Sequence, residues 1–85
     1  MSDLAFEAAV IAIVADTFST DPTRIGLHTT ADDVEGWDSL GHSILLARLS
    51  QKLGIDIGEE IAVEPNNVGE LIGRLAEERA RVAHD

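Results

Sequence analysis

Three stretches of this 85-residue chain carry apolar residues at the spacing of an α-helix, and none shows the alternation of a strand. They run from Asp3 to about Phe18, from Ser39 to Leu53 and from Val68 to Ala83. Each apolar stripe must be covered, and in so short a chain only the other helices can cover it. With a short helical stretch at Gly58 to Val63, the sequence predicts an all-α fold. We expect a small four-helix bundle of three long helices and one short helix, as a single domain over residues 1–85.

The helix ends and the core can be predicted from the same pattern. Asp38 and Asn67 are natural N-caps for the second and last helices, and Gly54 is a natural C-cap. His42 lies on the apolar stripe of the second helix. The residues expected in the core are Leu4, Val10, Ile11, Val14 and Phe18, then Leu45, Leu46, Leu49 and Leu53, and finally Val68, Leu71, Ile72 and Leu75.

A long loop, residues 19–38, joins the first two helices. Connections of about 20 residues are unusual in compact domains and are often functional. We expect Ile25, Leu27 and Val34 to anchor the loop, and Asp21 to cap one helical turn that begins at Pro22.

Charge and composition exclude several functions. Sixteen acidic and six basic residues give a net charge of −10, which repels nucleic acids and anionic membranes and favours basic protein surfaces. There is no cysteine, so a disulfide framework, a thiolate metal site and a cysteine nucleophile are ruled out. No apolar run approaches the ~20 residues that span a bilayer. We expect a cytoplasmic, monomeric protein with no nucleic-acid partner and no membrane insertion.

Most catalytic sites are also missing from the sequence. A hydrolase triad could be named from Asp38, Ser39 and His42, but it would not function. Side chains of neighbouring residues on one helical turn point in different directions. The histidines and loop acids have no recognisable metal-ligand spacing. What remains is the segment from Gly36 to Leu40, where Ser39 offers a hydroxyl at the mouth of a helix. From spacing alone, a simple helix cap is the favoured explanation of Asp38 and Ser39.

The sequence Gly36-Trp37-Asp38-Ser39-Leu40 resembles the attachment motif of acyl carrier and peptidyl carrier proteins. The likeness extends over nearly the whole chain: a long helix, a long loop, an Asp-Ser-Leu helix, a short helix and a final helix. The stretch Leu49 to Ile57 also resembles the link that follows the second helix in that family. The resemblance implies that Ser39 accepts a 4′-phosphopantetheine arm from coenzyme A, with Asp38 and Leu40 beside it. The protein would not be an enzyme.

The same resemblance implies partners. A phosphopantetheinyl transferase would load the arm, and an acyl- or aminoacyl-activating ligase and condensing or acyl-transfer enzymes would use the thioester that it carries. The alternative from another class is a small acidic helical interaction module without a prosthetic group. Addition of one arm in the presence of coenzyme A and a transferase separates the two.

The second helix departs from the fatty-acid carriers of this family, in which it is rich in acidic residues. Ser39 to Leu53 contains none. Acidic residues flank it instead: Asp32, Asp33, Glu35 and Asp38 before it, and Asp56, Glu59, Glu60 and Glu64 after it. This pattern favours a specialised pathway over housekeeping fatty-acid synthesis.

Several further residues are candidates for partner contact. Leu40, Ile44 and Ala47 lie off the core stripe, with Arg48 beside them, and are expected to form an apolar docking patch. Trp37 is either another contact residue or a packing residue folded onto the bundle. His42 is either a partly buried, hydrogen-bonded histidine or a contact to the arm or its cargo.

Overall fold

The computed structural model describes residues 3–58 and 64–83, and its helices follow the predicted order. α1 spans Asp3–Thr17, α2 spans Ser39–Leu53 and α4 spans Val68–Ala83. These bounds agree with the sequence prediction to within one residue. No strand occurs in the described residues, so the all-α prediction is confirmed for them.

Short helical turns occupy the long loop, as the Asp-Pro sequence indicates for the first of them. η1 spans Pro22–Arg24 and η2 spans Ala31–Asp33. Asp21 caps η1 by accepting a hydrogen bond from the Thr23 backbone N–H at 2.9 Å, as predicted. The short helix predicted over Gly58 to Val63 lies, apart from Gly58, outside the described residues, so a four-helix bundle stays a prediction.

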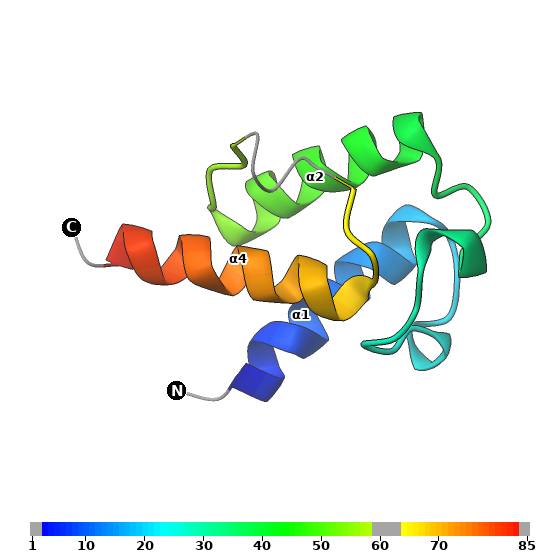
Figure 1. Ribbon diagram of the computed structural model, residues 1–85, viewed down its shortest axis with the longest axis horizontal. Coiled ribbons are helices and arrows are strands. Elements are labelled where there is room, and N and C mark those ends of the chain that lie inside the picture. Colours follow the sequence, from blue (N-terminus) through cyan, green and yellow to red (C-terminus); the bar gives the residue numbers. More distant parts are fainter. Residues whose placement is uncertain (1–2, 59–63, 84–85) are drawn as a thin grey trace.

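The three long helices pack together, and the loop gathers at one end of them (Figure 1). α1 contacts α2, α4 and η1. The loop lies at the end of the bundle that holds the start of α2 and the start of α4, away from the first turn of α1 and the last turn of α4. Within the described residues, no helix is long and apolar enough to cross a membrane.

The core matches the prediction in α4, in most of α2 and in part of α1. Val10 and Val14 of α1 are fully buried as predicted. Ile11, Phe18, Leu46 and Leu53 were also expected in the core and are partly buried against it. Leu45 and Leu49 are fully buried, and so are the predicted stripe residues of α4 except Ile72, which is 7% exposed. In α1 the prediction for Leu4 is wrong, because this side chain is 75% exposed. Phe6, Ile13 and Ala15 are buried instead. α1 is apolar on nearly every side, so its periodicity does not determine which side faces inward.

The loop is anchored by two side chains and by its backbone. Ile25 and Val34 are each 7% exposed, as predicted. The prediction for Leu27 is wrong, since its side chain is 44% exposed. Leu27 anchors the loop through its carbonyl oxygen, which accepts a hydrogen bond from the Gly69 backbone N–H at 2.8 Å. The loop is thereby attached to the start of α4.

Candidate functional site

Ser39 is the first residue of α2, and its side chain is exposed. Asp38 precedes it in an extended conformation and caps the helix, as predicted. The Gly41 backbone N–H donates to Oδ1 of Asp38 at 2.8 Å, and the His42 N–H donates to its carbonyl oxygen, also at 2.8 Å. The cap therefore holds the first turn of α2 while the Ser39 side chain stays open to solvent.

Two glycines allow the loop to approach α2 at this point. A Cβ atom on Gly41 would lie 2.2 Å from the carbonyl oxygen of Gly36 and 2.9 Å from Cε1 of Phe18. Gly36 has φ +91°, a conformation that favours glycine. The backbone of the loop thus rests directly on the first turn of α2. Sequence reasoning missed Gly41, although a glycine inside the first turn of a helix was a signal.

Trp37 is a packing residue, and its selection as a partner contact needs correction. Its side chain is only 6% exposed, which leaves almost no surface for a partner. Its ring stacks on Phe18 with centroids 5.3 Å apart. Its indole Nε1–H donates to Nδ1 of His42 at 3.1 Å. Of the two alternatives that the sequence left open, packing onto the bundle is confirmed.

His42 is buried as its stripe position indicated, at 8% exposure. Nδ1 accepts the hydrogen bond from Trp37, but Nε2 is buried and has no partner among the described residues. The expectation of a hydrogen-bonded histidine is therefore met on one ring nitrogen. The same geometry excludes a hydrolase triad of Asp38, Ser39 and His42. Nδ1 of His42 accepts the hydrogen bond from Trp37, and the Asp38 carboxylate caps the helix.

The predicted docking residues lie on the exposed side of α2. Leu40 is 71% exposed and Ile44 is 46% exposed, with Ala47 also exposed. Arg48 reaches α1, where its Nη1 lies 2.8 Å from Oδ2 of Asp16 in an exposed ion pair. Such pairs contribute little to stability, but this one partly neutralises the positive charge of α2.

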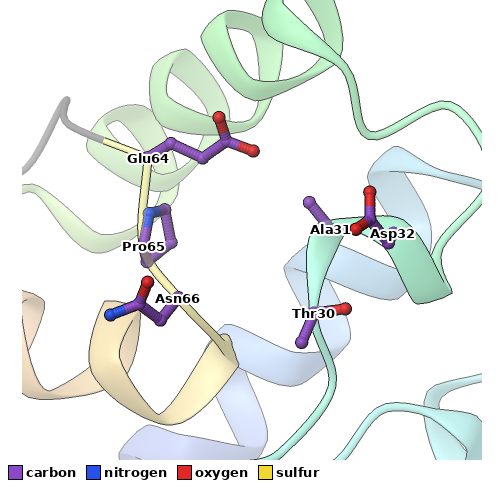
Figure 2. Close-up of a pocket in the computed structure, with 6 residues that line it drawn as sticks. All are labelled: Thr30, Ala31, Asp32, Glu64, Pro65 and Asn66. Carbon is purple, nitrogen blue, oxygen red and sulfur yellow. The ribbon is translucent and has the colours of Figure 1, made fainter.

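The surface has two hollows of interest, of which one reaches α2. One, of about 280 Å³, is lined by the end of α1, the turn at Gly36, Gly41 and Ile44. Figure 2 shows another of about 280 Å³, between η2 and the segment that leads into α4. Asp32 and Glu64 line opposite sides of it. Two of the acids that flank α2 in the sequence thus share one pocket. No group of three or more potential metal ligands occurs in the described part of the chain.

An exposed serine at the capped start of α2, on a small helical bundle, agrees with the carrier family that the sequence resembles. The family of the phosphopantetheine attachment site matches residues 8–75, and the chain belongs to this family. No curated protein and no solved structure matches the chain significantly.

Membership determines the general activity. The domain is the site of covalent 4′-phosphopantetheine attachment, and the protein is a carrier that tethers acyl groups on this arm. It is not itself an enzyme. It interacts with a phosphopantetheinyl transferase and with enzymes that use the tethered substrate.

Proposed function

We propose that Ser39 is the residue that carries the 4′-phosphopantetheine arm. The observation that supports this most strongly is its position: an exposed hydroxyl on the first residue of α2, inside the matched span and within an Asp-Ser-Leu sequence. When bound, the arm supplies a thiol that holds an acyl or aminoacyl group as a thioester. A chain without cysteine gains its sulfur chemistry in this way.

The residues around Ser39 fit a phosphodiester. Asp38 fixes the first turn through its hydrogen bond to the Gly41 N–H, so the Ser39 hydroxyl is held at a defined place. The start of a helix carries the positive end of its dipole, which stabilises a negatively charged group there. Leu40, the next residue, is 71% exposed and offers apolar surface beside the arm.

Ser43, one turn later, is the matched alternative within the same helix. Its Oγ donates to the carbonyl oxygen of Ser39 at 3.2 Å, so its hydroxyl is already engaged by the helix. It also lies inside the helix, where backbone rearrangement to meet a transferase is restricted.

The attachment site is tested by labelling with coenzyme A, magnesium and a broad-specificity phosphopantetheinyl transferase. The intact mass of the wild-type protein should rise by one arm. Ser39→Ala should abolish the addition and Ser43→Ala should leave it intact, with helical circular dichroism spectra in both. Labelling that persists in Ser39→Ala would refute the assignment.

We also propose that this carrier serves a specialised pathway, through a docking surface that differs from an acidic second helix. α2 has no carboxylate, and its exposed side presents Leu40, Ile44 and Ala47. Apolar contact there would supply the binding energy, while the flanking acids steer basic partners. Asp32 and Glu64 line one pocket, which supports separate roles for the acidic residues, which steer, and the apolar residues, which bind. Suitable partners are a dedicated acyl- or aminoacyl-activating ligase and condensing or acyl-transfer enzymes.

The docking proposal predicts a charge-dependent defect with housekeeping enzymes. A fatty-acid enzyme that presents Arg and Lys would meet Arg48 and Lys52, and like charges slow the encounter. Holo protein should be a poor substrate for a housekeeping ketosynthase or malonyl transferase. Replacing both residues by Glu should raise the rate, most strongly at low salt.

The matched control replaces both residues by Gln, which removes positive charge without adding negative charge. Its rate should lie between those of wild type and the Glu variant. The gain over wild type should be small, because the charge of Arg48 is already partly neutralised by Asp16. If wild type works as well as the housekeeping pathway's own carrier, the specialised role fails while attachment at Ser39 stands.

A further inference from the structure

The hollow that reaches α2 combines apolar side chains with a single charged one. Phe18 and Ile44 line it with apolar groups, and the touching backbones of Gly36 and Gly41 complete this part of the lining. Among the described residues, Glu35 is the one charged residue that lines it. Its volume of about 280 Å³ lies below the ~300–1,000 Å³ of sites for drug-sized ligands, so it suits a single side chain.

The end of α1 adds negative polarity to this hollow. α1 has no basic residue in its last turn, so the negative end of its dipole is not offset from within the helix. The carbonyl oxygen of Thr17, its last residue, accepts no hydrogen bond from the described part of the chain. Arg48 offsets part of this charge from α2 through the exposed carboxylate of Asp16, but it does not line the hollow.

Ser19, which also lines the hollow, has a backbone conformation that glycine adopts more easily. Its φ is +53°, and it is the one non-glycine residue with a positive φ in the described chain. The Thr20 N–H donates to the Ala15 carbonyl at 2.9 Å and the Ser19 N–H to the Asp16 carbonyl at 3.4 Å. This is the Schellman pattern, whose left-handed position usually holds glycine. The Ser19 side chain is exposed and makes no hydrogen bond to a described residue, so its hydroxyl is available to a ligand.

A second hollow, of about 520 Å³, shares one wall with the first, formed by Phe18, Ser19, Glu35 and Gly36. Of the two hollows, Arg24 and Asp33 line only this second one. Asp33 is engaged by the backbone N–H and the hydroxyl of Thr30, at 3.0 and 3.1 Å. Glu35 forms no ion pair with Arg24 or with any other described residue. Arg24 therefore opposes a cation in the first hollow without occupying it.

The hollow continues the apolar docking patch of α2. Ile44 belongs to both, and Leu40 lies one turn before it. Gly41, on the edge of the hollow, lies two residues after Ser39. An enzyme that covers the patch to reach the arm therefore also covers the hollow.

We propose that this hollow is a socket for an arginine side chain of a basic partner enzyme. The guanidinium would contact the Glu35 carboxylate and the Ser19 hydroxyl at the end of α1. The apolar stem would pack on Phe18 and Ile44. Arginine fits better than lysine because its planar fork of donors engages a carboxylate, a hydroxyl and a carbonyl together. The net charge of −10 favours such a partner. The socket rests on the proposed function, since the enzymes that use the arm would supply the arginine.

Titration of the apo protein with N-acetyl-arginine amide tests the socket without an enzyme and without the arm. NMR shifts of the backbone amides should concentrate at the hollow, namely at Phe18, Ser19, Glu35, Gly36 and Gly41, with a dissociation constant of roughly millimolar size. The citrulline derivative, which has the same shape without the charge, and the leucine derivative should bind at least about threefold more weakly. Equal or tighter binding of either at these residues, or no saturable binding of the arginine derivative, overturns the proposal.

Two acidic residues provide a matched pair of variants. Glu35→Gln should weaken binding of the arginine derivative about two- to fivefold. Asp32→Asn removes the same charge from the other acidic pocket and should leave the affinity nearly unchanged. Arg24→Gln, which removes the opposing charge, should strengthen binding. If Glu35→Gln and Asp32→Asn weaken it equally, the ligand responds only to the overall charge and the socket does not exist.

Ser19→Gly separates binding from stability. Its melting temperature should rise by about 2–8 °C, because glycine is favoured at this left-handed position. Its affinity for the arginine derivative should nevertheless fall about twofold, since the hydroxyl is lost. A more stable variant with unchanged affinity would show that Ser19 only ends the helix and would overturn its place in the socket. These measurements use the apo protein, so labelling at a residue other than Ser39 would refute the proposed function and leave them intact.

Discussion

α2 and α4 begin with the same kind of side-chain cap, but the first residue of α2 is exposed and that of α4 is buried. Asp38 caps α2 and Asn67 caps α4, each through Oδ1. Each oxygen accepts from the backbone N–H three residues later, Gly41 or Glu70, at 2.8 Å. By the rules of helix capping the two starts are equivalent.

The two helix starts differ in how the loop covers them. The loop lies against the start of α4, where the Val68 and Gly69 N–H groups donate to the carbonyls of Thr29 and Leu27, both at 2.8 Å. Val68 is fully buried. At the start of α2, by contrast, Ser39 is exposed. The loop contacts both helix starts, but at α4 it covers the first backbone N–H groups, whereas at α2 it packs on Gly41 and leaves Ser39 exposed. The tertiary contact therefore decides which helix start presents a side chain to solvent.

The largest effect that would break this comparison is steric. Gly41→Ala places a Cβ 2.2 Å from the Gly36 carbonyl oxygen, a rigid backbone atom. We expect the free energy of unfolding to fall by about 2–3 kcal/mol, despite the helix propensity of alanine. Urea denaturation of the apo protein measures it.

Gly69→Ala is the matched control at the start of α4. Its Cβ would lie 3.0 Å from the Leu27 carbonyl oxygen and 3.3 Å from Oδ1 of Asn67, so smaller shifts suffice. The gain in helix propensity should offset most of the strain, for a net change within about 1 kcal/mol. Equal destabilisation by both variants would contradict the tighter contact at α2.

A smaller effect separates the two caps. Asp38→Ala and Asn67→Ala should each lower the free energy of unfolding by about 1 kcal/mol, because each leaves one N–H without its acceptor. Only Asp38→Ala should also slow labelling by the transferase, since it loosens the turn that presents Ser39. Thermal unfolding and the labelling rate measure the two quantities on the same samples.

Asn67→Ala is therefore the control for a general loss of stability. If it slows labelling as much as Asp38→Ala does at equal loss of stability, the two starts are functionally alike and the comparison fails. Asp38→Asn, which keeps a capping oxygen, should retain both stability and most of the labelling rate.

The sequence predicts these helix starts well because capping is local. Asp38, Gly54 and Asn67 act through neighbours a few residues away, and all three take the predicted roles. The stripe of α4 is equally clear, because polar residues cover its other faces. Leu4 fails for the opposite reason: α1 is apolar all round, so only packing selects the buried face.

The parts of the site that depend on distant contacts were not predictable. Burial of Trp37 requires Phe18 and His42, which come from other elements. Leu27 was expected to anchor by its side chain, yet it anchors by its carbonyl, and hydropathy carries no signal for that. Gly41 and Gly36 meet through backbone atoms, which leave no pattern in the sequence beyond the glycines themselves.

The smallest expected effect concerns a third helix start, that of η1, whose residues are exposed to solvent. The Thr23 backbone N–H and the Thr23 hydroxyl both donate to Oδ1 of Asp21, at 2.9 and 2.8 Å, and they hold the pKa of this carboxyl below its ordinary value. Since the folded-state pKa is lowered, the stabilisation is present at neutral pH and is lost as the pH falls through the folded pKa. Thr23→Ala removes only the hydroxyl, the smaller of the two causes, so the pKa of Asp21 should rise part of the way. An NMR titration of the Asp21 carboxyl measures this. If Thr23→Ala restores the ordinary value in full, the backbone N–H does not act as a cap, and the likeness between η1 and the two long-helix starts is lost.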